Sequence, residues 1–261
     1  STLSMLKNLS LRGDEISLKT LVGIENCTKL QNLSIDGCHH LIDVEGLSGC
    51  KELENIELEM DTYIISNKSK LTNLDGLQGC NSLIKINIQE AKSLKNLGGL
   101  KGLKALKTID ISGAEALENL DGLLGCNSLE YISIRESYSD ESSNQLIENI
   151  DGLKGLNKLT HVDLSKFNSL KNIDGFAGCP ALESLSIQSD SLENIDGLKN
   201  LKVLNSVTLN IVNLKNVDGL SGCKSLESCL INSQYGDQIC GNLENLNGLK
   251  GINKIKELTI P

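Results

Sequence analysis

Apolar residues recur at fixed positions along the whole chain, and ten glycines mark the register of this pattern. Most of these anchoring glycines lie 22 or 23 residues apart, and three spacings are longer, at 30, 30 and 29 residues. The anchoring glycines are Gly23, Gly46, Gly76, Gly99, Gly122, Gly152, Gly175, Gly197, Gly219 and Gly248. A period near 22–23 residues that fills a chain is typical of a solenoid, in which each coil packs only against its neighbours. The pattern predicts one elongated stack rather than several globular domains.

Each coil contains a short segment in which apolar and polar residues alternate. Counted from the anchoring glycine, positions +10 and +12 are apolar, as with Leu33 and Ile35, and positions +9, +11 and +13 are mostly polar. Alternation with a period of two predicts a β-strand with one face in the core and the other toward solvent. We therefore expect an α/β solenoid of about ten full coils plus a partial N-terminal coil. Its strands would form a parallel sheet on the concave face, with short helical turns or loops on the convex face.

Polar residues around the anchoring glycine predict how each turn is held. An acidic residue at position −1, such as Asp75, is expected to cap a helical turn, because a short acceptor there can bind an orphan backbone N–H. Position +3 is Gly or Asn, which predicts a left-handed exit from the turn. Asn at position −3, such as Asn73, is expected to bind backbone groups of adjacent coils. The uniform repetition of these columns favours structural roles over metal binding or catalysis.

The combined motif resembles a known repeat family. The strand motif Leu-x-x-Leu-x-Ile, followed by Leu-x-Asn-Ile-Asp-Gly-Leu, resembles a leucine-rich repeat. The 22-residue copies around Gly197 and Gly219 are similar to the internalin-like bacterial class, and the 23-residue copies resemble receptor L domains. The resemblance spans residues 1–261. It implies a leucine-rich repeat solenoid that binds a protein ligand, and a location at the cell surface or in secretion. A cytoplasmic location stays open because the chain has many cysteines.

Charge and composition argue against several other functions. The net charge is −9 and the isoelectric point is about 5.0, whereas phosphate-backbone binding needs clustered Lys and Arg. We therefore predict no nucleic-acid partner. No window reaches the roughly 18 consecutive apolar residues of a membrane span. No Ser/His/Asp set, phosphate-binding loop or paired-carboxylate arrangement stands apart from the repeat. We predict a chain that is not an enzyme and that needs no cofactor.

The nine cysteines divide into a repeat column and three exceptions. Six lie at position +4, where other coils have Leu or Ile, so they are expected to be buried and to act as small apolar side chains. Cys229, at the inward position +10, should also be buried, whereas Cys38 and Cys240 lie outside the columns and are expected to be accessible thiols. The stretch Cys38-His39-His40 has ligand-type residues, but consecutive side chains cannot easily converge on one ion. A polar return loop without metal is the favoured interpretation.

The outward strand positions predict a binding surface near the middle of the stack. Most of these positions carry small polar residues, but Tyr131, Arg135 and His161 cluster at the centre. Tyr and Arg are enriched at the energetic centres of protein interfaces. The alternative is a solvated sheet face with one chance aromatic.

The three long spacings come from insertions, which predict a second binding surface. They span residues 59–70, 135–146 and 232–242, and each carries one tyrosine: Tyr63, Tyr138 and Tyr235. Each insertion follows a strand, so all three should leave the same edge of the solenoid. Insertions on one face of a repeat array often mark the binding side. Relics of an ancient duplication would give the same spacing.

The two ends of the chain break the repeat in the same register, and neither carries a polar cap. Because an uncapped solenoid leaves apolar end coils exposed, we expect a piece of a larger protein. Three functions remain open: a protein-binding module, a structural spacer or stalk, and the recognition part of a larger enzyme or effector. The first is the preferred hypothesis.

Overall fold

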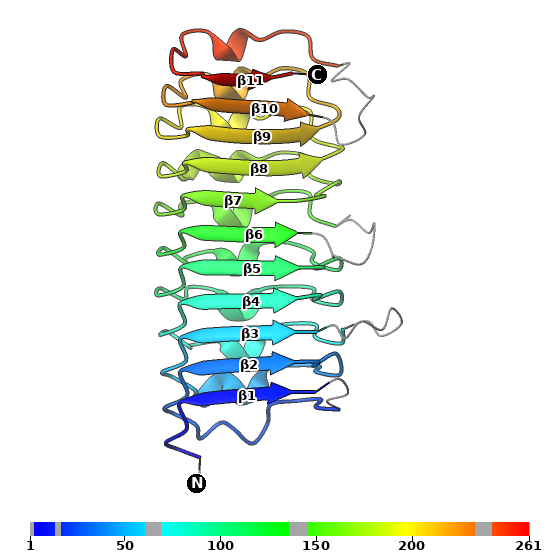
Figure 1. Ribbon diagram of the computed structural model, residues 1–261, viewed down its shortest axis with the longest axis vertical. Coiled ribbons are helices and arrows are strands. Elements are labelled where there is room, and N and C mark those ends of the chain that lie inside the picture. Colours follow the sequence, from blue (N-terminus) through cyan, green and yellow to red (C-terminus); the bar gives the residue numbers. More distant parts are fainter. Residues whose placement is uncertain (1–2, 14–16, 61–68, 136–145, 233–241, 261) are drawn as a thin grey trace.

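The computed structural model describes residues 3–13, 17–60, 69–135, 146–232 and 242–260. Within these residues, eleven strands form one parallel sheet in which each strand pairs with the next along the chain, and their arrowheads all point to the same edge (Figure 1). The strands are β1 (Asn8–Arg12), β2 (Asn32–Asp36), β3 (Asn55–Glu59), β4 (Lys85–Gln89), β5 (Thr108–Ser112), β6 (Tyr131–Arg135), β7 (His161–Leu164), β8 (Ser184–Ser189), β9 (Ser206–Ile211), β10 (Ser228–Asn232) and β11 (Glu257–Thr259). The predicted strand in each coil is confirmed.

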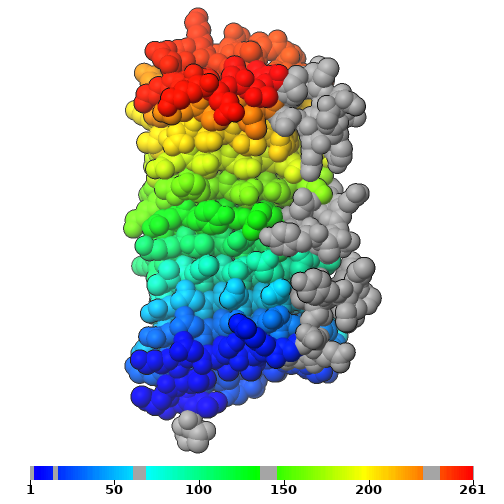
Figure 2. Space-filling model, in the orientation of Figure 1, coloured from blue at the N-terminus to red at the C-terminus, as the bar shows by residue number. Residues whose placement is uncertain are grey.

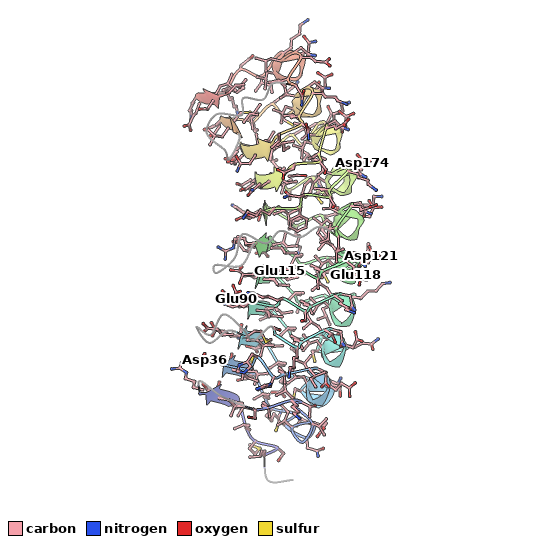
Figure 3. All side chains as sticks on the ribbon, turned by 90° about the vertical axis from the view of Figure 1, so that its right-hand side faces the viewer. Asp36, Glu90, Glu115, Glu118, Asp121 and Asp174 are labelled. Carbon is pink, nitrogen blue, oxygen red and sulfur yellow. The ribbon has the colours of Figure 1, made fainter. Side chains whose placement is uncertain are left out.

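Short 3-10 turns lie on the side of the stack opposite the sheet. Within the described residues they are η1 (Glu45–Gly49), η2 (Asp75–Leu77), η3 (Gly98–Leu100), η4 (Asp121–Leu123), η5 (Asp151–Leu153), η6 (Asp174–Gly178), η7 (Asp196–Leu198), η8 (Asp218–Leu220) and η9 (Asn247–Leu249). The stack bows so that the strands line its concave side, with Asp121 and Asp174 on the convex side (Figure 3). The predicted assignment of sheet and turns to the two faces is therefore confirmed.

The core is a continuous column of aliphatic side chains between the sheet and the turns. Equivalent residues of successive coils stack in register, as in Ile109, Ile132 and Val162 on neighbouring strands. Leu129 at position +7 and Ile132 at position +10 are both fully buried. Because every coil repeats these positions, each one buries its apolar face only against its neighbours, as expected for a solenoid.

The anchoring glycines allow neighbouring turns to approach closely. At Gly122, an added Cβ atom would lie 2.0 Å from the backbone oxygen of Leu97 in the preceding coil. The corresponding distances at the other anchoring glycines from Gly46 to Gly248 range from 1.7 to 2.2 Å. No side chain fits there, so this column is fixed by backbone packing.

The residue at position +3 leaves the turn in the left-handed region in most coils, as predicted. Gly155 has φ +78°, and Asn200 has φ +63° at the equivalent position. Gly49 and Gly178 differ because their turns, η1 and η6, continue through these residues.

The predicted capping role of the acidic column is wrong. The turns begin at the acidic residue itself, and the apolar residue before it makes no side-chain cap hydrogen bond, as at Asp75 and Leu74. The acceptor is the Asn at position −3: the Asn73 Oδ1 accepts from the backbone N–H of Asp75 at 3.0 Å. All eight Asn residues of the column make this bond within their own coil, at 2.9–3.2 Å. The prediction that these Asn side chains bond to adjacent coils is therefore also wrong. They bond instead within their own coil, since an Asn side chain readily binds the backbone N–H two residues later.

The cysteine column is buried, as predicted, and the thiols of Cys50, Cys80, Cys126, Cys179 and Cys223 also contact backbone oxygens of the preceding coil. The Cys126 Sγ lies 3.2 Å from the backbone oxygen of Leu100 in the preceding coil, and the Cys80 Sγ lies 3.4 Å from that of Leu47. Burial raises the pKa of these thiols. The eight cysteines within the described residues are free, and Cys229 is fully buried, as expected.

The prediction that Cys38 is an accessible thiol is wrong. The side chain is fully buried, and its Sγ lies 3.3 Å from the Glu59 backbone oxygen and 3.4 Å from the Met60 Sδ. Cys38 lies outside the repeat columns, but Glu59 and Met60 of the next coil cover it. Burial raises the pKa of this thiol to about 12. Cys240 lies outside the described residues.

The two histidines after Cys38 lie in different surroundings. His39 is buried, whereas His40 is half-buried and its Nδ1 lies 3.4 Å from the Lys70 Nζ. Within the described residues, no group of three or more His, Cys, Asp or Glu side chains is arranged to hold a metal ion. In the same part of the chain, no helix is long and apolar enough to cross a membrane.

Candidate functional site

The outward residues of β5, β6 and β7 form a charged and aromatic surface at the centre of the concave face. We call this surface the central patch; it comprises Asp110, Tyr131, Ser133, Arg135, His161 and Asp163. The patch is positioned by strict strand register, in which Tyr131 lies opposite His161, and Ser133 lies between Asp110 and Asp163. Figure 2 views the sheet face on which these strands lie, with β5 to β7 in its green middle band.

The aromatic part of the patch is open to solvent. Tyr131 is 37% exposed, and His161 beside it on β7 is also exposed. The His161 Nδ1 lies 2.9 Å from the hydroxyl oxygen of Thr160. The structure therefore brings two of the sequence-predicted residues into a neighbouring pair, as their shared register position indicates.

Arg135 lies at the other end of β6, and its charge is paired. The Arg135 Nη2 contacts both carboxylate oxygens of Asp110, at 3.0 and 3.2 Å. Both side chains are partly buried, with exposed fractions of 34% for Arg135 and 25% for Asp110. Asp110 was not among the residues predicted for the site, although an outward acidic residue on the strand before Arg135 is the signal that could have identified it.

Asp163 is the second carboxylate of the patch. Burial raises the pKa of this group, against the opposing influence of Arg135 and of hydrogen bonds from Ser165 and Ser186. An aspartate in this setting gains free energy from a cation that enters beside it, because the cation offsets the cost of its desolvation.

Ser133 has an unusual environment for an outward residue of a sheet. Its neighbours Ile132 and Ile134 point into the core, so its hydroxyl lies on the concave face. The side chain is nevertheless fully buried, and its hydroxyl oxygen has no hydrogen-bond partner. A buried polar atom without a partner costs free energy, so a ligand that supplied a hydrogen-bond partner here would recover part of that cost.

The concave face as a whole is acidic. The outward positions of β1–β11 carry six carboxylates and only three basic side chains. The carboxylates are Asp36, Glu57, Glu59, Asp110, Asp163 and Glu257, and the basic residues are Arg12, Lys85 and Arg135. Figure 3 shows Asp36 on the strand side of the stack. This excess favours a partner with positive charge at its contact surface.

A shallow groove of about 280 Å³ lies over β1–β4, at the N-terminal end of the same face. Carboxamides line it in a row: the Asn32 Nδ2 donates to the Asn8 Oδ1 at 2.6 Å, and the Asn55 Nδ2 donates to the Asn32 Oδ1 at 2.8 Å. Because these amides bind one another, the row is a structural ladder along the strands. This ladder was not predicted from the sequence.

The three inserted segments start from one edge of the sheet. They follow β3, β6 and β10, whose C-terminal ends all lie at the edge marked by the arrowheads in Figure 1. Arg135 ends β6, so the central patch reaches the start of the second insertion. The tyrosines of these insertions, Tyr63, Tyr138 and Tyr235, lie outside the described residues.

Comparisons with known proteins identify the fold. Residues 157–200 match the family model described as leucine-rich repeats in two copies, and no curated protein sequence matches the chain. The structure is similar to an internalin, inlF, from Listeria monocytogenes, with a TM-score of 0.55 and 16% identity over 98% of this chain and 87% of that one.

Two further structures show the range of proteins with this fold. Internalin C2 from Listeria monocytogenes has a TM-score of 0.55 and 21% identity over 79% of this chain and 82% of that one. The protein in a TLR13–ssRNA13 complex has a TM-score of 0.51 and 15% identity over 100% of this chain and 47% of that one. The chain is therefore a leucine-rich repeat solenoid of internalin-like fold.

Proposed function

We propose that this leucine-rich repeat solenoid is a non-catalytic protein-binding module. Its ligand would contact the central patch, and the inserted loops that carry Tyr63, Tyr138 and Tyr235 would contribute from the adjacent edge. The exposed pair of Tyr131 and His161, beside the carboxylates of the patch, is the observation that carries this proposal. An exposed tyrosine next to partly desolvated charges has the composition of an interface centre.

The fold supports a protein ligand. Leucine-rich repeat proteins, internalins and receptors among them, are typically protein-binding. The Listeria neighbours also favour a bacterial surface or secreted protein as the setting. A fold accommodates many ligands, however, so the proposal depends on the patch rather than on the neighbours.

Charge distinguishes this proposal from nucleic-acid binding. The TLR13 structure contains single-stranded RNA, but the present chain has a net charge of −9 and more carboxylates than basic residues on its concave face. A phosphate backbone would meet repulsion there. The remaining alternatives are a structural spacer, or the recognition part of a larger enzyme or effector.

A loss-of-capture experiment tests the proposal. The immobilised chain would be used to capture binding proteins, alongside a variant that combines Tyr131→Ala, His161→Ala and Tyr138→Ala. We expect a discrete captured protein to be lost at least tenfold, because the variant removes the exposed pair of Tyr131 and His161 together with the loop tyrosine Tyr138. A convex-face control, Lys154→Ala with Lys199→Ala, should retain it.

Capture that survives the triple substitution would refute the central patch as the binding surface. Equal loss in the convex-face control would indicate instead that binding depends on charge over the whole molecule. Circular dichroism of each variant checks that the fold is intact. If the chain is a structural spacer, we expect no discrete captured protein with the native chain or with either variant.

A further inference from the structure

The central patch has the chemistry of an arginine-binding slot, and Arg135 already shows how a guanidinium is held there. Its Nη2 contacts both oxygens of Asp110. A guanidinium has five N–H donors and no acceptor, so it needs several oxygen atoms around it. The second row of the patch supplies them: Asp110, the Ser133 hydroxyl and Asp163 lie side by side on β5, β6 and β7.

The buried hydroxyl of Ser133 is an independent sign that the row is made for a ligand. It lies between two carboxylates, each on an adjacent strand, yet it has no partner. The two flanking strands are roughly 9.6 Å apart, twice the spacing of neighbours in a sheet. A planar cation above Ser133 would therefore have a carboxylate on each side.

The aromatic pair completes the slot. Tyr131 and His161 lie two residues before Ser133 and Asp163 on the same strands, at the preceding outward position, and both are exposed. The long side chain of an arginine could lie across the tyrosine ring while its guanidinium reaches the carboxylates. Cations over a tyrosine face are attracted by the ring.

We propose that the central patch binds an arginine side chain of the protein partner, and that Arg135 is a tethered competitor which occupies part of the slot in the unbound protein. This inference rests on the proposed function, since it names the chemistry of the partner at that site. Binding would displace Arg135 from Asp110, and the incoming guanidinium would take its place between Asp110 and Asp163. The acidic excess of the concave face would attract such a partner and repel an acidic one.

Agmatine, which carries a guanidinium group on a short chain, tests the slot without a partner. Titrations of the 261-residue chain would be followed by NMR signals of Tyr131 and His161, with putrescine as the ammonium counterpart. We expect weak agmatine binding to the native chain, at least tenfold tighter binding to Arg135→Ala, and at least tenfold weaker binding to Asp163→Asn. Putrescine should bind less well than agmatine, because it lacks the planar fork of donors.

Glu57→Gln is the matched control, because Glu57 is an outward carboxylate in the same row on β3, outside the central patch. It should leave agmatine binding within twofold of the native value. The inference fails if Arg135→Ala binds agmatine no tighter than the native chain, or if Glu57→Gln weakens binding as much as Asp163→Asn does. Ser133→Ala removes the hydroxyl between the two carboxylates without changing the charge, and it should weaken agmatine binding several-fold.

The results for the slot and for the protein-binding function can be told apart. If neither Arg135→Ala nor Asp163→Asn changes agmatine binding while the triple variant still loses its captured protein, the slot is refuted and the protein-binding function stands. If agmatine binds as expected while capture is unchanged in the triple variant, the guanidinium site stands and the protein-binding role of the patch is refuted.

Discussion

At the scale of single residues, two columns that look equivalent in the sequence have different structural roles. Asn194 accepts a hydrogen bond from the backbone N–H of Asp196, whereas the Asp196 side chain contacts the exposed Lys199. Sequence alone could not assign the cap, because both residues are short acceptors near the start of the turn. The choice depends on where the first free N–H points, and that is a property of the folded backbone.

Substitution of these two residues should separate their roles. We expect Asn194→Ala to lower the free energy of unfolding by about 1 kcal/mol, as loss of a helix-capping acceptor typically does. Asp196→Ala should change it by less than about 0.5 kcal/mol, because exposed ion pairs contribute little. Urea denaturation of both variants gives the comparison. A larger loss for Asp196→Ala would restore the capping role to the acidic column.

Two glycines of one coil allow an equally direct test of close approach. At Gly152 an added Cβ would lie 1.9 Å from the Leu120 backbone oxygen, whereas at Gly155, with φ +78°, nothing lies within 4 Å. We expect Gly152→Ala to cost about 3 kcal/mol, at the upper end of the usual range for overpacking, since the backbones of two coils must separate. Gly155→Ala should cost about 1 kcal/mol, the strain of a left-handed alanine. Similar midpoints of denaturation for the two variants would contradict this assignment.

Cys38 shows how a residue outside the repeat columns can still be buried. Burial raises the pKa of its thiol to about 12, and alkylation requires the thiolate, which is therefore scarce at pH 8. We expect iodoacetamide to leave Cys38 unmodified in the native protein and to modify it in urea, as measured by peptide mass spectrometry. Rapid native labelling of Cys38 would show that the end of β3 does not cover it.

At the scale of elements, the sequence predicts the strands well because their signal is local. Alternating residues such as Leu33 and Ile35 repeat in every coil, so their average outweighs exceptions such as Cys229. The patch is less predictable. Tyr131 and His161 could be paired from register alone, but the pairing of Arg135 with Asp110 depends on a diagonal reach between strands. The burial of Ser133 depends on its neighbours' side chains, which no periodicity encodes.

At the scale of the whole molecule, stability depends on where a coil lies in the stack. Inner coils have neighbours on both sides, whereas β11 pairs only with β10, through three residue pairs within the described part of the sheet. All three residues of β11 are exposed. In a solenoid, coupling passes mainly between adjacent coils, so a coil as exposed and as weakly paired as that of β11 is expected to unfold locally before the inner coils of the 261-residue chain.

The same repeat position in two coils measures this difference. Leu129 at position +7 is fully buried in an inner coil, whereas Ile255 at position +7 of the last coil is only partly buried. We expect Leu129→Ala to cost about 2–5 kcal/mol, the usual range for a large cavity in a core. Ile255→Ala should cost less than about 1 kcal/mol, because water already reaches that side chain and less apolar surface is lost from the core. Denaturation of both variants at several protein concentrations tests the comparison. If the two substitutions lower the free energy of unfolding equally, and the loss for Ile255→Ala rises with protein concentration, the last coil is covered by another copy of the chain.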